Sequence, residues 1–492
     1  MLKKKLLCLA LTGVLALSFG LLAACGDKED GGKDDGAVVL PYSDAGRTTT
    51  VAVHDPSVFQ DPVSKTYYAF GSHFAVASSD DLIHWEQKVG DGSNEANGQR
   101  EAQKLYGQGV NWRTVLSQAV AHAGAGMPST WAPDVNYHDG KYYMYVSLTS
   151  GFGKNRSIIV RVESENVLGP YANETVIFKS DGVPGGPNAI DPELFTDKDG
   201  GLWMVYGSHF AGIYVLELEN DGANWGMPKA DQGSGTLLWK GGSKVVEGPF
   251  VFYNEQTEYY YLMTTYGALD SDYNMRIARS KNPDGPYVDI EETDVATVAG
   301  GTTHGNSVAG NYKFARQGSD GKGYAALGHN SVVKDADGRY FVVCHVRRQN
   351  VNGTVEGGHS LHVFQLFFNE DGWPVMSPNA YVGEKLGKVK AGQVASEYEV
   401  VIHSSSTSVT SVPSVNYTLE SGGAVTIDGE DVGTWQLKGD YYITIALGEE
   451  TYKGVVAPGW DMYMADQSTA DGLLTITAVS ATGKSLWALA TY

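Results

Sequence analysis

Carboxylates and one histidine stand at the start of short apolar runs in four separated parts of the sequence. These segments are His54-Asp55-Pro56, Ile190-Asp191-Pro192, Glu247-Gly248-Pro249 and Gly328-His329-Asn330. Two carboxylates on opposite sides of a scissile bond can serve as general acid and general base. The sequence has no Gly-x-Ser-x-Gly elbow, Walker loop, His-Glu-x-x-His motif or paired zinc-ligating cysteines. The residues therefore favour acid–base chemistry of the kind that cleaves glycosidic bonds.

The neighbours of the three carboxylates suggest different roles for them. Asp55 has no basic residue within several positions, which suits a base that stays ionised. Glu247 follows an apolar pair, and we expect desolvation to raise its pKa, as a general acid requires. Asp191 could bond to Glu247 or its neighbours and hold that acid protonated. A lone Asp at a strand start is more often a turn residue, but three at equivalent repeat positions favour function.

The elements that carry these residues repeat along the chain. Five units read as strand, turn and strand, with first strands starting at positions 55, 134, 191, 248 and 330. Five such units predict an all-β fold, a five-bladed β-propeller whose polar residues converge on one axis. Asp134 occupies a repeat position, and we expect its role to be structural. The segment from Glu86 to Pro128 is predicted to be a loop region with a short helix.

The ends of the chain have different compositions. Residues 1–24 have the positive and apolar regions of a lipoprotein signal peptide, and Leu22-Ala23-Ala24-Cys25 predicts lipidation of Cys25. An ordinary secretory signal is the alternative. Residues 25–47 are predicted to be a flexible tether, residues 48–385 the propeller, and residues 388–492 a small C-terminal β-barrel or sandwich domain. Cys344 lies between apolar residues and is expected to be a buried strand cysteine.

Composition limits the partners. The 492 residues carry a formal net charge of −21, which would repel a phosphate backbone and argues against nucleic acid. With 61 glycines and 11% aromatic residues, the chain is typical of a β protein rich in tight turns. We expect a monomer that is secreted and held at the bacterial membrane only by its N-terminal lipid.

Several motifs together resemble a known family. His54-Asp55-Pro56-Ser57-Val58, Thr130 to Val135, Asn188 to Pro192, Glu247-Gly248-Pro249 and Gly328 to Val333 are similar to the signature segments of glycoside hydrolase family 43. The similarity is greatest to its endo-1,5-α-L-arabinanases of the two-domain type. Asp461 and Leu486-Trp487 resemble the barrel domain of the larger arabinanases.

The resemblance implies an inverting hydrolase of arabinan and arabino-oligosaccharides. Asp55 would be the general base, Glu247 the general acid, and Asp191 the residue that tunes the acid and orients substrate. The base and the acid should then lie about 6.5–9.5 Å apart, to leave room for water. Further residues match segments that line the sugar subsites: Trp131, Gly153, Asn188, Ala189, Ile190, Ser208, His209 and Phe210.

Some implied roles leave alternatives open. His209-Phe210 departs from the family pattern, so the aromatic surface that stacks on sugar could differ here. Trp131 could equally stack on sugar or plug its blade. His329 resembles a histidine that faces a calcium ion in the central channel, although calcium prefers oxygen ligands and would be held largely through water. The alternative for His329 is a channel histidine without a metal.

Two other functions fit the same sequence. The first is an exo-acting α-L-arabinofuranosidase or β-xylosidase, since loop lengths do not show whether the cleft is open at both ends. The second is a sugar-binding propeller without catalysis, which would have no need of an acid–base pair. The three carboxylates favour the enzyme.

Overall fold

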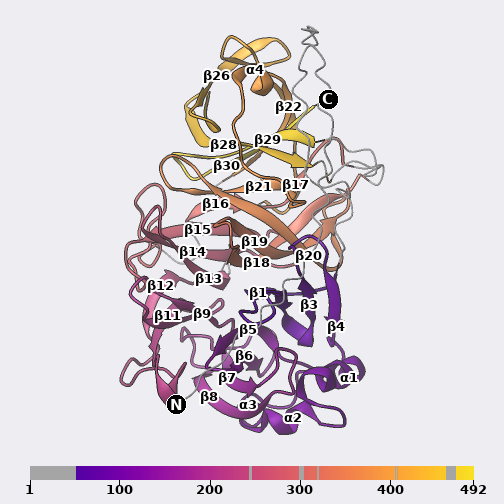
Figure 1. Cartoon of the computed structure of the whole chain (residues 1–492), viewed down its shortest axis with the longest axis vertical. Helices are drawn as coiled ribbons and strands as arrows, with labels where there is room; N and C mark the ends of the chain where they lie inside the picture. The colour runs from indigo at the N-terminus through magenta and orange to yellow at the C-terminus, as the bar shows by residue number, and fades with distance from the viewer. Residues whose placement is uncertain are drawn as a thin grey trace, which may run out of the picture. The chain divides into compact units, whose positions relative to one another are not determined.

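The predicted propeller is present. The computed structural model describes residues 51–491 except 243–245, 299–303, 318–320, 405, 407, 461 and 463–471. Five antiparallel sheets follow one another along the chain, and their first strands lie around one central region (Figure 1). This arrangement brings positions 275 residues apart within hydrogen-bonding distance, as Ser331 and Pro56 show. The strands also match the all-β composition.

The blades have these strands. Blade one contains β1 (Ser57–Gln60), β2 (Tyr67–Phe70), β3 (Val76–Ser79) and β4 (Glu86–Val89). Blade two contains β5 (Trp131–His138), β6 (Lys141–Thr149), β7 (Arg156–Ser164) and β8 (Ala172–Asp181). Blade three contains β9 (Glu193–Thr196), β10 (Leu202–Tyr206), β11 (Gly212–Leu218) and β12 (Thr236–Lys240). Blade four contains β13 (Val246–Asn254), β14 (Tyr259–Tyr266), β15 (Asn274–Ser280) and β16 (Asn306–Ala309). Blade five contains β17 (Tyr312–Lys313), β18 (Gly323–Lys334), β19 (Tyr340–Gln349), β20 (Val355–Phe368) and β21 (Pro374–Ala380).

In each blade, a residue with a positive φ angle lies within or just before the innermost strand, which is β1, β5, β9, β13 or β18. In blade order these residues are Asp55 (53°), Ala132 (34°), Asp191 (55°), Gly248 (54°) and His329 (44°). In blades two, four and five the strand register also shifts at this point, as at a β-bulge. A left-handed residue costs energy unless the surroundings hold it, so a kink repeated in all five blades points to a functional constraint.

This repeat corrects the predicted alignment of blade two. Asp134 is not equivalent to Asp55 and His329, because the residue at the kink of blade two is Ala132. The error arose because a carboxylate was taken as the marker of the repeat position, whereas the backbone kink is what recurs. We call these five residues the kink positions.

In four of the five blades, the residue two places after the kink makes a side-chain hydrogen bond to a neighbouring blade. Asp134 accepts hydrogen bonds from Ser57 Oγ of blade one at 2.7 Å and from the Leu194 amide of blade three at 2.9 Å. The Glu193 carboxylate accepts from the Val251 amide of blade four at 3.1 Å.

Blade five is joined to blade one in the same way. Ser331 Oγ accepts from the Val58 amide at 3.0 Å and donates to the Pro56 carbonyl at 2.8 Å. Asp134 was expected to be structural, and these bonds show the role it plays.

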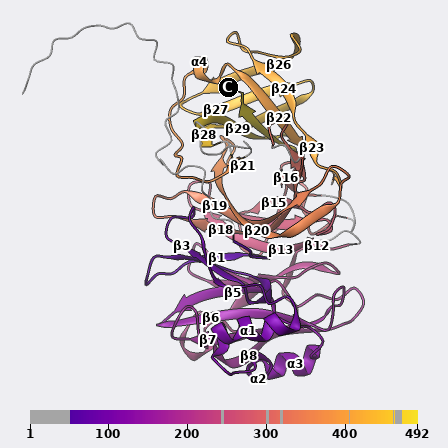
Figure 2. The same cartoon turned by 90° about the vertical axis from the view of Figure 1, so that its right-hand side faces the viewer.

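The segment predicted to be a loop is mostly helical. It contains α1 (Glu95–Tyr106), α2 (Trp112–Val115) and α3 (Ser117–Ala123), close to blade two (Figure 2). Asn94 caps α1 by accepting from the Asn97 amide, and buried Ala102, Leu105 and Tyr106 pack into the core of blades one and two. The sequence analysis predicted one short helix here and underestimated the helical content, because the polar residues of α1 hide its one-sided apolar face.

The C-terminal domain is a closed barrel, which decides between the two predicted forms. After α4 (Ala391–Val394), eight strands close in the order β22-β24-β25-β26-β27-β28-β29-β30 (Figure 2). Their bounds are β22 Glu397–His403, β24 Val415–Leu419, β25 Ala424–Ile427, β26 Glu430–Lys438, β27 Tyr442–Leu447, β28 Glu450–Trp460, β29 Gly472–Ser480 and β30 Ser485–Ala490. Buried apolar side chains such as Tyr398, Ile443 and Ile476 pack together in its core.

Several contacts connect the barrel to blade five. The short strand β23 (Val412–Pro413) pairs in parallel with β17, and a buried ion pair joins Arg316 Nε to Glu399 at 2.9 Å. Cys344 is fully buried on β19 as expected, with a free thiol. Among the described residues, no helix has the length and apolar character that a membrane span requires. The predicted signal peptide, Cys25 and Asp461 lie outside the described residues.

Candidate active site

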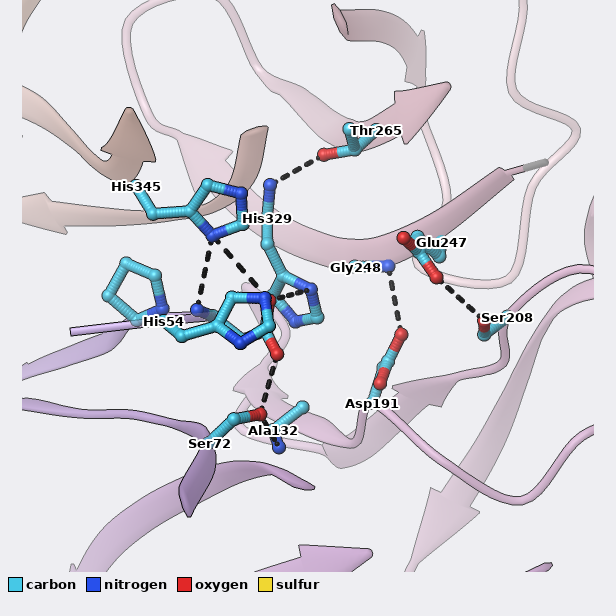
Figure 3. A network of polar contacts seen from close by, with 12 residues as sticks. His54, Ser72, Ala132, Asp191, Ser208, Glu247, Gly248, Thr265, His329 and His345 are labelled. Carbon is cyan, nitrogen blue, oxygen red and sulfur yellow. Dashed lines mark hydrogen bonds and ion pairs between the residues drawn. The ribbon is translucent and has the colours of Figure 1, made fainter. Parts of the chain in front are cut away.

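The predicted catalytic residues meet where the kinked ends of the blades converge. Asp55, Asp191 and His329 are themselves kink positions, and Glu247 directly precedes the fourth, Gly248. Figure 3 shows Asp191, Glu247 and His329 near one another, with polar contacts to Gly248, Ser208 and Thr265, respectively. The kink matters because it turns a side chain off the alternating faces of the strand and toward the axis.

Asp55 is surrounded by donors. Its Oδ2 accepts from Ser72 Oγ at 2.5 Å, while its Oδ1 lies 3.1 Å from His54 Nε2 and 3.0 Å from His329 Nδ1. Burial by itself would raise its pKa, but His329 and His54 outweigh burial, so the pKa lies well below the usual value. Asp55 is therefore ionised at neutral pH, as a general base must be.

Glu247 differs from its sequence prediction. Its carboxylate accepts from Tyr273 Oη at 2.8 Å and Ser208 Oγ at 2.9 Å, and lies 2.9 Å from His209 Nε2. Burial alone would raise the pKa of Glu247, but His209 and His329 have the larger effect and lower it to about 2. The expectation of a raised pKa was wrong for this structure, because the flanking valines do not reveal the histidine brought from blade three.

Asp191 holds the proton that Glu247 lacks. Burial, reinforced by the charges of Glu247 and Asp55, raises the pKa of Asp191 to about 7 even though His329 opposes the change. Its Oδ2 accepts from the Gly248 amide at 3.2 Å, which confirms the predicted bond to a neighbour of Glu247. In the free protein near neutral pH, Asp191 is therefore partly protonated while Glu247 is ionised.

His329 lies among all three carboxylates. Its amide donates to Thr265 Oγ1 at 2.7 Å, and Asp55, Asp191 and Glu247 together raise the pKa of its ring to about 9 against the effect of burial. A protonated ring offers no lone pair to a metal, so calcium could bind here only by replacing this proton. The carboxylate charge would suit a divalent cation, and water would supply most of the oxygen ligands that calcium prefers.

The predicted sugar-binding residues fall into two groups. Partly or fully exposed residues are available for contact: Trp131, Gly153, His209 and Phe210. The Phe152 ring is 84% exposed and meets Trp131 edge-on at 6.2 Å, an apolar surface of the kind sugars stack on. Ser208 is buried but reaches Glu247 through its hydroxyl.

The side chains that precede Asp191 face the interior. Asn188 accepts from Ser157 Oγ at 2.6 Å and is 2% exposed, while Ala189 and Ile190 are also buried. The structure thus shows these three residues positioning Asp191. Their contact with substrate stays a prediction, as does the separation of Asp55 from Glu247.

Three residues of the site were not predicted. Ser72 bonds to Asp55 and to the Ala132 amide, Tyr273 bonds to Glu247, and His345 places Nδ1 3.2 Å from the Asp55 amide. No local pattern marks Ser72 or Tyr273. His345 did carry a signal, because a histidine inside the apolar run of a central strand needs a reason to be buried.

The fold and the site together define a propeller enzyme with a carboxylate centre, and comparison with known proteins gives its family. Residues 108–374 match the model of glycosyl hydrolases family 43, and residues 378–488 match a C-terminal lipocalin-like domain. The chain belongs to glycoside hydrolase family 43.

Relatives with known names extend over both domains. An extracellular endo-α-(1→5)-L-arabinanase 2 of Bacillus subtilis is 36% identical, with 89% of this chain and 92% of that protein covered. The extracellular endo-α-(1→5)-L-arabinanase of Thermotoga petrophila is 37% identical, over 89% and 93% of the two chains. A crystal structure of the Thermotoga petrophila endo-1,5-α-L-arabinanase superposes with a TM-score of 0.80 at 34% identity, over 91% of this chain and 100% of that one.

Proposed function

We propose that this protein cleaves α-1,5-L-arabinofuranosidic bonds within arabinan. The observation that carries the proposal is the pair of ionised carboxylates, Asp55 and Glu247, on blades one and four of one centre. Support comes from the two endo-arabinanases that match at 36–37% identity along most of their length. Asp55 would activate water, and Glu247 would protonate the leaving oxygen.

Glu247 needs a proton before it can act as an acid. In the free protein His209, whose side chain is 35% exposed, stabilises the ionised form from 2.9 Å. A sugar that displaced His209 would remove this stabilisation and leave Glu247 in a less hydrated site, which favours its protonated form. Asp191, with its pKa near 7, lies beside Gly248 and could supply the proton. Substrate binding would thus favour the protonated form of Glu247, in which it can act as the acid.

The products test the reaction. Early hydrolysis of linear arabinan should give a mixture of oligosaccharides, while arabinose alone from the start would show exo action. Proton NMR during the first turnovers should show the inverted anomer, because the proposed base activates water directly. If Glu247→Ala kept full hydrolytic activity, the protein would instead be a sugar-binding propeller or use another acid.

We also propose calcium as a cofactor near His329. His329 would provide one ligand and water the others, and the bound ion would supply positive charge to the carboxylate centre. The clustering of Asp55, Asp191 and Glu247 around this ring supports the proposal. Chelation followed by elemental analysis tests it: activity should fall with calcium content and return on adding calcium. A fully active, metal-free protein would refute the cofactor.

We propose that the protein acts outside the cytoplasm as a lipid-anchored monomer. The relatives named above are extracellular, and the signal and Cys25 segment supports a lipid anchor. Labelling with a radioactive fatty acid should mark the wild-type protein in a bacterial host and leave Cys25→Ala unlabelled. Light scattering of the detergent-solubilised full chain should give one chain per particle, and a larger mass would contradict the monomer.

A further inference from the structure

A cluster of three histidines lies beside Asp55, with which two of them are in contact. His54, His345 and His359 each offer a ring nitrogen, and the three nitrogens lie within 4.8 Å of one another. His54 comes from the start of blade one, and the other two come from β19 and β20 of blade five. The group shares no residue with the proposed calcium position at His329.

Two of the three rings have an unused nitrogen. Nε2 of His345 and Nε2 of His359 are buried, and neither makes a hydrogen bond. The His345 side chain has no exposed surface at all. Buried polar atoms in native proteins nearly always have a partner, so two orphaned nitrogens facing one cluster call for an explanation.

The other nitrogens of this cluster point at Asp55. His54 Nε2 lies 3.1 Å and His345 Nδ1 lies 3.5 Å from Asp55 Oδ1. Histidines that bind a metal commonly donate their second ring N–H to a carboxylate, which fixes the tautomer and the ring orientation. Asp55 stands in the place of that carboxylate for both rings, and this leaves His54 Nδ1 for the ion.

We propose that His54, His345 and His359 bind one divalent transition-metal ion of the zinc class. Three imidazoles suit zinc, copper, nickel or cobalt, whereas calcium prefers oxygen. Burial lowers the pKa of all three rings, so they are neutral at pH 7 and able to ligate.

Binding requires two local changes. The His54 and His359 rings are stacked, with centroids 3.7 Å apart and an interplanar angle of 11°, so they cannot both direct a lone pair at one ion. His359 must turn about its side-chain bonds, which its half-buried position at the exposed start of β20 permits. The His345 proton must also move from Nε2 to Nδ1, which exchanges the bond from the Asp55 amide for one to the Asp55 carboxylate.

Metal titration of the untagged, chelator-treated full chain tests the site. Calorimetry with zinc chloride should show one ion per chain, and excess calcium should not displace it. Cobalt should bind at the same stoichiometry with the visible absorption of a four-coordinate, nitrogen-ligated ion. Failure of the wild type to bind one zinc, displacement by calcium, or the weak spectrum of a six-coordinate, oxygen-ligated cobalt would each overturn the proposal.

Variants locate the ion. His359→Gln should weaken zinc binding by about tenfold or more, since it removes one ligand. His362→Gln, three residues later on the same strand and outside the cluster, should bind as the wild type does. Zinc should raise the melting temperature of the wild type and His362→Gln but not of His359→Gln. Equal zinc affinity in all three proteins would refute the assignment, and the cobalt spectrum of the wild type decides the case if His359→Gln does not fold.

Discussion

Two sets of side chains surround the centre of the propeller. They differ in role, although their positions lie only two residues apart in the sequence. The kink positions and Glu247 put Asp55, Asp191, Glu247 and His329 into the site. The residues two places later, Ser57, Asp134, Glu193 and Ser331, bond to neighbouring blades instead. Because alternate residues of a strand point to the same face, the kink is what separates these two sets.

At this centre, one set of side chains is expected to serve activity and the other to serve stability. Both sets contain buried carboxylates, and Glu193 and Asp134 have raised pKa values because burial is not balanced by a nearby cation. In the catalytic set, histidines from other blades reverse the effect of burial for Asp55 and Glu247. Substitutions in the first set should therefore reduce turnover, and substitutions in the second should reduce the free energy of unfolding.

The largest effect is expected from the acid and the base. Asp55→Asn and Glu247→Gln should each lower kcat on linear arabinan by about 10²–10⁴-fold, the usual contribution of general acid–base catalysis. With an aryl arabino-oligosaccharide whose leaving group needs no proton, the loss in Glu247→Gln should shrink while that in Asp55→Asn remains. Steady-state kinetics on both substrates measure the difference.

A matched control for this pair is Glu258→Gln, an exposed carboxylate at the blade-four turn, which should keep wild-type turnover. Equal recovery of both catalytic variants on the aryl substrate would contradict the separate roles of acid and base.

The inter-blade bonds should show the opposite behaviour. Asp134→Ala leaves the Leu194 amide and the Ser57 hydroxyl without their acceptor and should lower the free energy of unfolding by about 2–4 kcal/mol. Urea denaturation followed by tryptophan fluorescence measures it. Asp139→Ala, at the exposed turn that follows the same strand, is the control. An unchanged unfolding midpoint in Asp134→Ala would show that the bonds do not fasten the blades.

A substitution at a kink itself should affect geometry before stability. A Cβ on Gly248, whose φ is 54°, would lie 3.0 Å from His329 Cγ and press it away from Asp55. Gly248→Ala should lower kcat by about 10–100-fold, since displacements near 1 Å can cost a hundredfold. Gly338→Ala is a control with a positive φ and no atom close to the added carbon except the end of Lys334. Wild-type kcat in Gly248→Ala would mean that the kink tolerates a side chain.

A further prediction concerns pH and His329. Its folded pKa is raised from 6.5 to about 9, so the folded protein holds more protons in this window than the unfolded chain does. The contribution of this ring to the free energy of unfolding is complete below pH 6.5. It is lost as the pH rises to about 9, at up to about 1.4 kcal/mol per pH unit. His329→Gln should lack this decline in urea titrations between pH 6.5 and 9. A variant with the wild-type slope would place the titration elsewhere.

Asp191 provides a check on that result. The pKa of its carboxyl is raised from 3.8 to about 7. The free energy of unfolding should therefore fall as the pH rises from 3.8 to about 7. Asp191→Asn should therefore flatten the lower part of the pH curve and also move the decline attributed to His329 to lower pH, because the Asp191 carboxylate is one of the charges that raise the pKa of that ring.

The sequence by itself predicted the blades and singled out the three carboxylates that meet at their centre. Strand and turn patterns around Asp55, Asp191 and Glu247 are local, so they can be recognised without knowing what lies beside them. For the same reason the pattern misplaced Asp134, since a carboxylate is visible in a sequence and a φ angle is not. The extent of the helical segment around α1 was underestimated because its polar surface resembles a loop.

Only the tertiary structure decided the charge of those carboxylates. Glu247 follows valines in the chain, yet its protonation depends on His209 at 2.9 Å, which lies 38 residues away in sequence on blade three. Asp55 likewise takes its low pKa from His329 on blade five as well as from adjacent His54. A pKa responds to charges within a few ångströms in space, and in a propeller those charges come from other blades.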